Sequence, residues 1–204
     1  ATRRPLGVVS VISPWNVPLV LTSRPMAFAL AAGNTVVLKP SEETPYCGGL
    51  LFAEIAEEAG LPPGVLNVVS GFGDTTGAPL IDHPDVRMAS FTGGTAGGRA
   101  VASVAARQVK PIIMELGGKS PQIVLADADL DLAVNGVATG IFPAAGQSCI
   151  SGSRLLLHKS IADEFTQRLI DVVGKVRVGD PLDPATQIGP IANRRHYETV
   201  LASI

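Results

Sequence analysis

The sequence contains few cysteines, few aromatic residues and almost no net charge. Among its 204 residues the only cysteines are Cys47 and Cys149, and aromatic residues make up 4%. A disulfide framework and a cysteine-rich metal cluster are therefore excluded. Sixteen basic side chains against eighteen acidic ones give a formal net charge of −2. Because nucleic-acid binding depends on an excess of positive charge, nucleic acid is excluded as a partner as well.

Long apolar runs are absent too. No run reaches the length of a membrane span and no signal-peptide pattern opens the sequence, so we expect a cytoplasmic protein without a membrane partner. Apolar residues still make up 46% of the chain, enough for the core of one large domain or of one domain and part of a second. The 22 glycines and 16 prolines are spread along the chain, which argues against a disordered or repetitive segment.

Short β-branched runs alternate with amphipathic stretches between residues 7 and 116. Strands are predicted at 8–12, 35–38, 65–69, 86–91 and 111–116. Helices are predicted at 17–32 and 44–59, with a short helix after Asp74 and a further helix that ends at Ala106. In the helix at 44–59, Leu50, Leu51, Ile55 and Ala59 would share one face. Four or more such units predict an α/β fold with a doubly wound, mostly parallel, Rossmann-like sheet.

The pattern changes after Gly117 and Gly118. Strands are predicted at 122–125 and 154–158, and helices from the acidic cluster at 127–131 to about 145, at 162–175 and at 192–204. The acidic cluster would cap the first of these helices. We therefore predict one domain over residues 1–117 and an incomplete second domain over 118–204. Because the chain lacks an initial methionine and its last helix has no stop signal, we expect a fragment of a longer protein.

The segment Phe91-Thr-Gly-Gly-Thr-Ala-Gly-Gly98 ends a predicted strand and opens a predicted helix. Free backbone N–H groups at a helix start suit a phosphate, and glycine lets the phosphate approach closely. The spacing differs from the Gly-x-Gly-x-x-Gly fingerprint of dinucleotide-binding turns. A tight turn with Thr92 or Thr95 as the helix N-cap is the alternative.

Lys39-Pro-Ser-Glu42 follows a predicted buried strand. A lysine and a glutamate at the carboxyl end of such a strand could hydrogen-bond ribose hydroxyls, and Glu42 would repel a 2′-phosphate. The alternative is a solvated turn in which Ser41 caps the next helix.

Glu115 stands at the end of an apolar strand, beside Gly117 and Gly118. Apolar surroundings disfavour the ionised carboxylate, which suits a general base that acts near neutral pH. Pairing of Glu115 with Lys119 or Lys110 is equally compatible with the sequence.

Cys149 lies in Gly146-Gln-Ser-Cys-Ile-Ser-Gly-Ser-Arg154, a loop between a predicted helix and a predicted strand. Most cysteines are small buried hydrophobes, but the loop position of Cys149 favours a nucleophile. Cys47 lies in a predicted helix and is taken as structural. His83, His158 and His196 are scattered, so neither a zinc site nor a Cys–His pair is indicated.

Six segments taken together are more specific than each alone. In chain order they are Ser13-Pro-Trp-Asn16, Lys39-Pro-Ser-Glu42, Gly71-Phe-Gly73, Phe91-Thr-Gly-Gly-Thr95, Glu115-Leu-Gly-Gly-Lys-Ser-Pro121 and Gly146-Gln-Ser-Cys149. In that order and spacing, from about Pro5 to its end, the chain resembles the aldehyde dehydrogenase superfamily. The resemblance implies NAD(P)-dependent oxidation of an aldehyde to a carboxylic acid. It also implies a cofactor-binding domain over residues 1–117, a catalytic domain over 118–204, and a parent protein that is a homodimer or homotetramer.

Three residues are similar to the catalytic groups of that family. Cys149 resembles its catalytic thiol and Glu115 its general base. Asn16 resembles the asparagine whose amide forms the oxyanion hole together with the backbone N–H of Cys149. These residue types suit a cysteine thiohemiacetal, hydride transfer and hydrolysis of a thioester. The presence of Glu115 favours hydrolysis over acyl transfer to coenzyme A, the first alternative. The presence of Cys149, Glu115 and Asn16 together argues against the second alternative, a non-catalytic nucleotide-binding protein of the same fold.

The resemblance also implies which residues surround the cofactor. Ile12, Ser13, Pro14, Trp15, Lys39 and Glu42 would line its adenosine half, Gly73, Phe91, Gly93, Gly94 and Gly98 would surround the pyrophosphate, and Leu116 would approach the nicotinamide. Because of Glu42, NAD is the expected cofactor and NADP is less favoured.

The chain also departs from the family pattern. Gly94 stands where a serine is common, so one hydroxyl contact to phosphate would be missing. Ala144 and Ala145 replace polar residues often found before Gly-Gln-x-Cys, which would alter the substrate tunnel. Family members are more than twice as long, so we expect this chain to lack a second cofactor-binding glutamate and the aromatic tunnel wall, and to be inactive alone.

Overall fold

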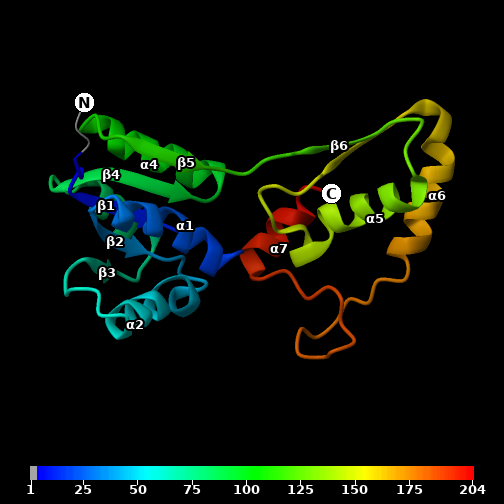
Figure 1. Cartoon of the computed structure of the whole chain (residues 1–204). Coiled ribbons are helices and arrows are strands. Elements are labelled where there is room, and N and C mark those ends of the chain that lie inside the picture. The colour runs from blue at the N-terminus through cyan, green and yellow to red at the C-terminus, as the bar shows by residue number, and fades with distance from the viewer. Residues whose placement is uncertain (1–3) are drawn as a thin grey trace. The chain divides into compact units, whose positions relative to one another are not determined.

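A computed structural model describes residues 4–204 of the chain. These residues form two compact units, and the division between them falls between Leu116 and Gly117 (Figure 1). Within the described residues, no helix is both long enough and apolar enough to cross a membrane.

The first unit is built on a five-stranded parallel sheet. Its strands are β1 (Val8–Ile12), β2 (Thr35–Lys39), β3 (Leu66–Val68), β4 (Val86–Thr92) and β5 (Ile112–Glu115). They lie side by side in the order β3-β2-β1-β4-β5, so the chain moves from β1 to one edge and then crosses to the other. In this register Ile12 lies beside Lys39 of β2 and beside Phe91 of β4. The reversal of strand order beside β1 confirms the predicted doubly wound, Rossmann-like sheet.

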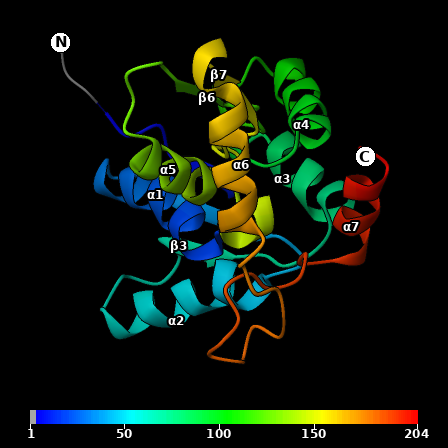
Figure 2. The same ribbon diagram turned by 90° about the vertical axis from the view of Figure 1, so that its right-hand side faces the viewer.

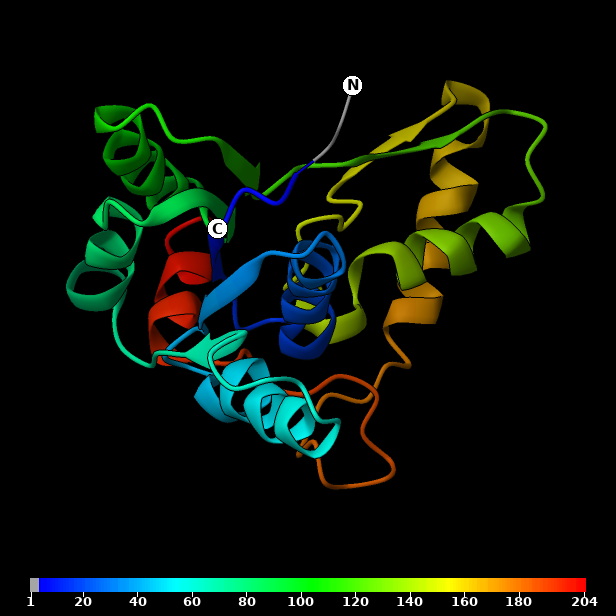
Figure 3. The same ribbon diagram turned by 60° about the vertical axis from the view of Figure 1, so that its left-hand side comes forward.

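Helices cover both faces of this sheet. α1 (Pro18–Ala31) and α2 (Leu51–Glu58) lie on one face, and α3 (Ala78–Asp82) and α4 (Thr95–Arg107) lie on the other (Figures 2 and 3). α1 begins at Pro18, where a missing N–H costs nothing, and is followed by Gly33 in the left-handed region at φ 81°. Two π-helical turns, Tyr46–Leu50 and Gly73–Gly77, lead into α2 and α3.

Side-chain alternation along β1 produces two apolar cores, one on each face of the sheet. Val9 and Val11 face α1 and α2, where Phe52 packs against them. Ile12 faces the opposite side, in a buried cluster with Phe91 and Val101. Burying each such side chain contributes about 1.5–3 kcal/mol, so a strand covered on both faces is apolar along most of its length.

The predicted helix at 44–59 differs from the structure in its start and in its buried face. It starts as a π-helical turn before α2. Leu50 and Ile55, two of the residues predicted to share one face, are 41% and 51% exposed, whereas Gly49 is buried. A Cβ atom on Gly49 would lie 2.5 Å from Cγ of Pro40, so the helix backbone itself contacts the proline ring. The contact of Gly49 was not predicted, because hydrophobic periodicity does not reveal a contact that glycine makes.

The second unit contains a two-stranded parallel sheet and helices around it. β6 (Pro121–Val124) pairs with β7 (Arg154–Leu157), and the α-helices are α5 (Leu130–Ile141), α6 (Ala162–Val173) and α7 (Arg194–Leu201). α5 and α6 pack together against one face of the sheet (Figure 2). Val124, Val134, Val137 and the fully buried Phe165 form the centre of this core. The two strands lie within one residue of their predicted ranges, and α5 and α6 lie inside the ranges predicted for helices.

Capping residues and a proline determine where the helices of this unit begin and end. The carboxylate of Asp129 accepts hydrogen bonds from the N–H groups of Asp131 and Leu132 at 3.0 and 3.1 Å, which confirms the predicted acidic cap. α5 ends at Ile141 and not near residue 145, because Pro143 lacks the N–H that would continue the helix. α7 ends at Leu201, so the expectation that it continues to residue 204 is wrong.

Two glycines of α5 predict opposite effects of the same substitution. A Cβ atom on Gly136 would meet no heavy atom within 4 Å, whereas on Gly140 it would lie 2.5 Å from Oε1 of Gln122. We expect Gly136→Ala to raise the free energy of unfolding by about 0.8–1 kcal/mol, because alanine favours the helix. We expect Gly140→Ala to lower it by about 1–3 kcal/mol, because Gln122 must move. Urea unfolding of both variants measures the difference, and equal stabilities would contradict the observed packing.

Candidate active site

The carboxyl ends of the parallel strands collect most of the predicted cofactor residues at one edge of the first unit. Ile12, Lys39 and Phe91 are neighbours in adjacent strands at this edge. Because the carboxyl ends of parallel strands meet at the same edge of a sheet, the loops that follow them lie close together. These loops contain most of the residues of the predicted site. In open α/β sheets such an edge, at the point where strand order reverses, is where ligands bind.

Lys39 is a buried charged residue at the end of β2. Its side chain is 2% exposed, and Nζ donates to the carbonyl of Pro40 at 2.8 Å and to Oε2 of Glu42 at 3.5 Å. The Glu42 side chain is 37% exposed, so this carboxylate is available to a ligand. The turn is solvated only in part, because Lys39, Pro40 and Ser41 are buried whereas Glu42 and Glu43 are exposed. Ser41 does not cap a helix but accepts the N–H of Glu43 at 3.3 Å within the turn.

The π-helical turn Gly73–Gly77 closes over the same lysine. A Cβ atom on Gly77 would lie 3.5 Å from Cδ of Lys39 and 3.6 Å from Cδ1 of Ile12, so this turn contacts both strand ends. Gly73, at the start of the turn, has open space around its Cα. The lysine stem is thus enclosed while its ammonium group stays at the strand end.

Ser13 contributes a buried hydroxyl group to this edge. Its backbone N–H donates to the carbonyl of Lys39 at 3.2 Å, and its Oγ has no hydrogen-bond partner within residues 4–204. Leaving a buried hydroxyl unpaired costs about 1–3 kcal/mol, so a ligand that hydrogen-bonds to it would be favoured. Pro14, Trp15 and Asn16 follow and are half-buried.

α4 begins without a side-chain cap. Its N-cap is Gly94, so the two threonines considered as caps, Thr92 and Thr95, do not serve that role. The first N–H bonded within the helix is that of Gly98, which donates to the carbonyl of Gly94 at 3.0 Å. The N–H groups before it point out of the helix start, as an anion-binding site requires.

Glycines around α4 are required by two neighbouring side chains. The ring of Phe91 lies against Gly93 and Gly97, where a Cβ atom would come within 2.7 and 2.9 Å of its Cζ. At Gly98 a Cβ atom would lie 2.6 Å from Cδ2 of Leu116. The glycine-rich segment therefore packs closely on the sheet in addition to leaving its N–H groups open.

Glu115 is the last residue of β5, at an edge of the sheet. Its carbonyl accepts the N–H of Gly93 at 3.0 Å, which joins the strand end to the glycine-rich turn. Its side chain is exposed, so the enclosed apolar surroundings expected from the sequence are not present in this unit. An edge strand has a neighbour on one side only, and this leaves its last residues open.

The lysines considered as partners of Glu115 have other hydrogen bonds. Nζ of Lys110 donates to the carbonyls of Ile81 at 2.6 Å and His83 at 2.5 Å. Burial lowers the pKa of Lys110 from its ordinary value, although Asp82 acts in the opposite direction. Nζ of Lys119, in the second unit, donates to the carbonyl of Gly118 at 3.2 Å.

Cys149 lies in the second unit, in the loop between α5 and β7, and is half-buried. The N–H of Ser151 donates to the carbonyl of Ser148 at 3.2 Å and closes a turn that contains the cysteine. Just before this turn, Ala144 and Ala145 adopt left-handed φ angles of 53° and 54°. Alanine is strained in that region, at a cost of about 1 kcal/mol or more for each residue.

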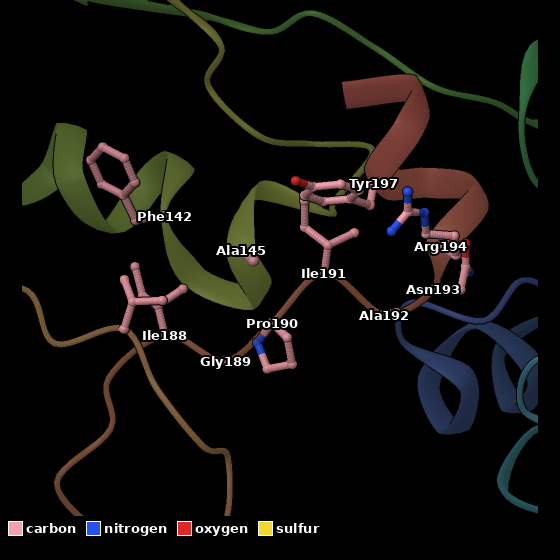
Figure 4. Close-up of a pocket in the computed structure, with 11 residues that line it drawn as sticks. Phe142, Ala145, Ile188, Gly189, Pro190, Ile191, Ala192, Asn193, Arg194 and Tyr197 are labelled. Carbon is pink, nitrogen blue, oxygen red and sulfur yellow. The ribbon is translucent and has the colours of Figure 1, made fainter. Parts of the chain in front are cut away.

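A hollow beside the Cys149 loop was not predicted from the sequence. It has a volume of about 810 Å³ and a largely apolar lining that includes Phe142, Ile188, Ile191 and Tyr197 (Figure 4). Oε1 of Gln147, two residues before Cys149, accepts the N–H of Ala192 in the lining at 2.9 Å. The segment 188–192 carries no chemical motif, so only its position beside the loop could identify it.

The predicted catalytic residues are divided between the two units. Asn16 and Glu115 belong to the first unit, and Cys149 belongs to the second. The cofactor residues, by contrast, all lie in the first unit.

Comparison with known proteins shows the family of the chain. The family model described as "Aldehyde dehydrogenase family" matches residues 1–204. The chain is 48% identical over 196 residues to hydroxyisobutyraldehyde dehydrogenase of Mycolicibacterium austroafricanum. This alignment covers 96% of this chain and 39% of that protein. It is 49% identical over 202 residues to phenylacetaldehyde dehydrogenase of Pseudomonas fluorescens. That alignment covers 99% of this chain and 40% of the relative.

Solved structures share the fold. PnpE from Pseudomonas sp. WBC-3, crystallised in complex with nicotinamide adenine dinucleotide, is 50% identical with a TM-score of 0.94, covering 98% of this chain and 41% of that one. An NAD+ complex of aldehyde dehydrogenase from Bacillus cereus is 42% identical with a TM-score of 0.94, over 98% of this chain and 40% of that one. The chain thus spans about 40% of the length of the relatives it matches.

The packing around α4 predicts a contrast between two adjacent glycines. We expect Gly93→Ala to lower the free energy of unfolding by about 1–3 kcal/mol, because the ring of Phe91 is held in the core. Gly94 has open space and an ordinary φ of −72°, so Gly94→Ser should raise stability by a few tenths of a kcal/mol through a better N-cap. Thermal unfolding monitored by circular dichroism compares them. A stable Gly93→Ala variant would show that the ring does not confine this turn.

Proposed function

The chain belongs to the aldehyde dehydrogenase family, and we propose that the protein oxidises an aldehyde to a carboxylic acid with NAD as hydride acceptor. The observation that carries this proposal is the group of residues at the carboxyl ends of the strands in the first unit. There a buried lysine, an accessible glutamate, an unpaired hydroxyl and an uncapped helix start lie together. Because the chain spans about 40% of its relatives, the activity is proposed for the complete protein.

The edge has the donors and acceptors that a dinucleotide requires. Nζ of Lys39 and the carboxylate of Glu42 would hold the hydroxyls of the adenosine ribose, beside Ile12, Ser13, Pro14 and Trp15. The free N–H groups at the start of α4 would hold the pyrophosphate, near Gly73, Phe91, Gly93, Gly94 and Gly98. Leu116 would lie near the nicotinamide, which accepts the hydride when the cofactor is bound.

The catalytic chemistry follows from the three remaining residues. The Cys149 thiolate adds to the aldehyde carbonyl, and the amide of Asn16 and the N–H of Cys149 stabilise the resulting oxyanion. Loss of hydride from this thiohemiacetal gives a thioester on Cys149. Glu115 then accepts a proton from water, which attacks the thioester and releases the carboxylic acid and the free thiol. The exposed position of the Glu115 side chain leaves it open to such a water.

The proposal extends to the organisation of the protein. The unit before Gly117 is proposed as the cofactor-binding domain and the unit after it as part of the catalytic domain, in a homodimer or homotetramer. A cytoplasmic location stays a prediction. The names of some relatives place those proteins in chloroplasts and peroxisomes.

The position of Glu42 predicts the coenzyme preference. Its carboxylate lies next to the ammonium group of Lys39 and would repel a 2′-phosphate on the same ribose. We expect the complete protein to have a higher kcat/KM with NAD than with NADP, and Glu42→Gln to reduce that ratio. Steady-state kinetics with both coenzymes tests this. Equal or better use of NADP by the wild type would contradict the assignment.

The assigned roles predict that two substitutions stop the reaction at different steps. Cys149→Ala should abolish NADH formation, because no thiohemiacetal can form. Glu115→Gln should leave a burst of NADH, about one per active site, followed by slow turnover, because hydride transfer precedes the hydrolysis that needs the base. Stopped-flow measurement of NADH separates the two phases, and mass spectrometry locates the acyl group.

The second cysteine provides the control. Cys47 is exposed in the turn before α2, and Cys47→Ser should turn over like the wild type. Acylation of Cys47, wild-type turnover in Glu115→Gln, or an acyl group delivered to coenzyme A at the wild-type rate would refute the roles assigned to Cys149 and Glu115.

A further inference from the structure

One glutamine side chain connects the loop of Cys149 to the helix behind it. Gln122 lies on β6, on the face that is covered by α5 and α6. Its Nε2 donates to the carbonyl of Gly152 at 2.8 Å and to the carbonyl of Val137 in α5 at 3.2 Å. Each of its two N–H groups therefore has a partner, one in the loop and one in the helix.

The surrounding backbone leaves room for this amide. A Cβ atom on Gly140 would lie 2.5 Å from Oε1 of Gln122, and one on Gly152 would overlap with the same side chain. The N–H of Gly152 donates to the carbonyl of Gly140 at 2.9 Å. Gly152 is thus held on both sides, by α5 through its N–H and by Gln122 through its carbonyl.

The position of Gly152 is passed on to Cys149 through the turn between them. Ser151 is buried, and its bond to the carbonyl of Ser148 closes the turn that contains Cys149. On the other side, the carbonyl of Cys149 packs against Gly118, where a Cβ atom would lie 2.9 Å away. With Gly152 fixed, the backbone of Cys149 has little freedom to move.

We propose that Gln122 is a positioning residue for Cys149, a role that rests on the proposed function of that thiol. Gln122 acts through Gly152. The reaction requires a fixed distance and orientation between the thiol and the backbone N–H of Cys149. Both groups move when the turn moves. If the amide is removed, two carbonyls lose their donor and the turn loses its anchor. A displacement of about 1 Å at reacting atoms can cost on the order of 10²-fold in rate.

The test compares Gln122→Met with the wild type in the complete protein, using propionaldehyde and phenylacetaldehyde. Methionine fills a similar volume but donates no hydrogen bond. In a single turnover with enzyme in excess over aldehyde, we expect the rate constant of NADH formation, called here the burst rate constant, to fall about 10- to 100-fold. The affinity for NAD and the KM for aldehyde should stay within about twofold, because ground-state binding is not altered. Gln167→Met is the matched control, since Gln167 bonds Asp171 within α6, and it should behave like the wild type.

A second variant separates positioning from general destabilisation. Gln122→Glu keeps the shape, but the ionised carboxylate donates no hydrogen bond and faces two carbonyl oxygens. The protonated acid donates one hydrogen bond and so restores part of the link. We expect the ratio of burst rate constants, variant to wild type, to rise as the pH falls. Because the ionised carboxylate also lowers the stability of the fold, the folded fraction is measured by circular dichroism at each pH and the rate constants are compared per folded active site.

The outcomes distinguish this inference from the function on which it rests. Wild-type burst rates in Gln122→Met, or a pH-independent ratio for Gln122→Glu, would overturn the positioning role and leave the chemistry of Cys149 intact. If Gln122→Met does not fold, the pH dependence of Gln122→Glu alone decides. A protein that still forms NADH with Cys149 replaced by alanine would overturn the proposed function itself.

Discussion

The burial of one positive charge constrains the proposed cofactor edge. Lys39 ends the second strand of the sheet with its side chain 2% exposed, and a buried ammonium group is tolerated only with close oxygen partners. The carbonyl of Pro40 and the carboxylate of Glu42 supply them, so the chain after the strand must turn back on itself. That turn brings the Pro40 ring against Gly49 and fixes the start of the next helix. The positions of Lys39 and Glu42, which would bind a ribose, therefore follow from the need to neutralise the buried ammonium group.

Much of the fold was predictable because it depends on local signals. The β-branched runs became strands, Gly33 follows the first helix, and the acidic residues before Leu132 cap α5. The sheet order followed because parallel units of this length have few possible topologies. What failed depended on contacts between distant residues. The turn before α2 packs on Pro40 through Gly49, and no periodicity in the sequence encodes that contact.

The candidate site was predicted in part for the same reason. Residue types and their order indicated Lys39, Glu42 and Cys149, but burial and exposure came only with the fold. Glu115 was expected in apolar surroundings and lies open on an edge strand. Gln122 drew no attention in the sequence, because an isolated glutamine in a strand carries no chemical signal. Its importance appears only where its amide reaches the carbonyl of Gly152, 30 residues away.

The assigned roles depend on NAD binding at the edge around Lys39. A crystal structure of the complete protein with bound NAD tests it most directly. We expect the hydroxyls of the adenosine ribose to lie within hydrogen-bond distance of Nζ of Lys39 and the carboxylate of Glu42. We also expect the pyrophosphate at the first N–H groups of α4. A dinucleotide bound elsewhere, with the lysine and glutamate bonded only to each other and to Pro40, would contradict it.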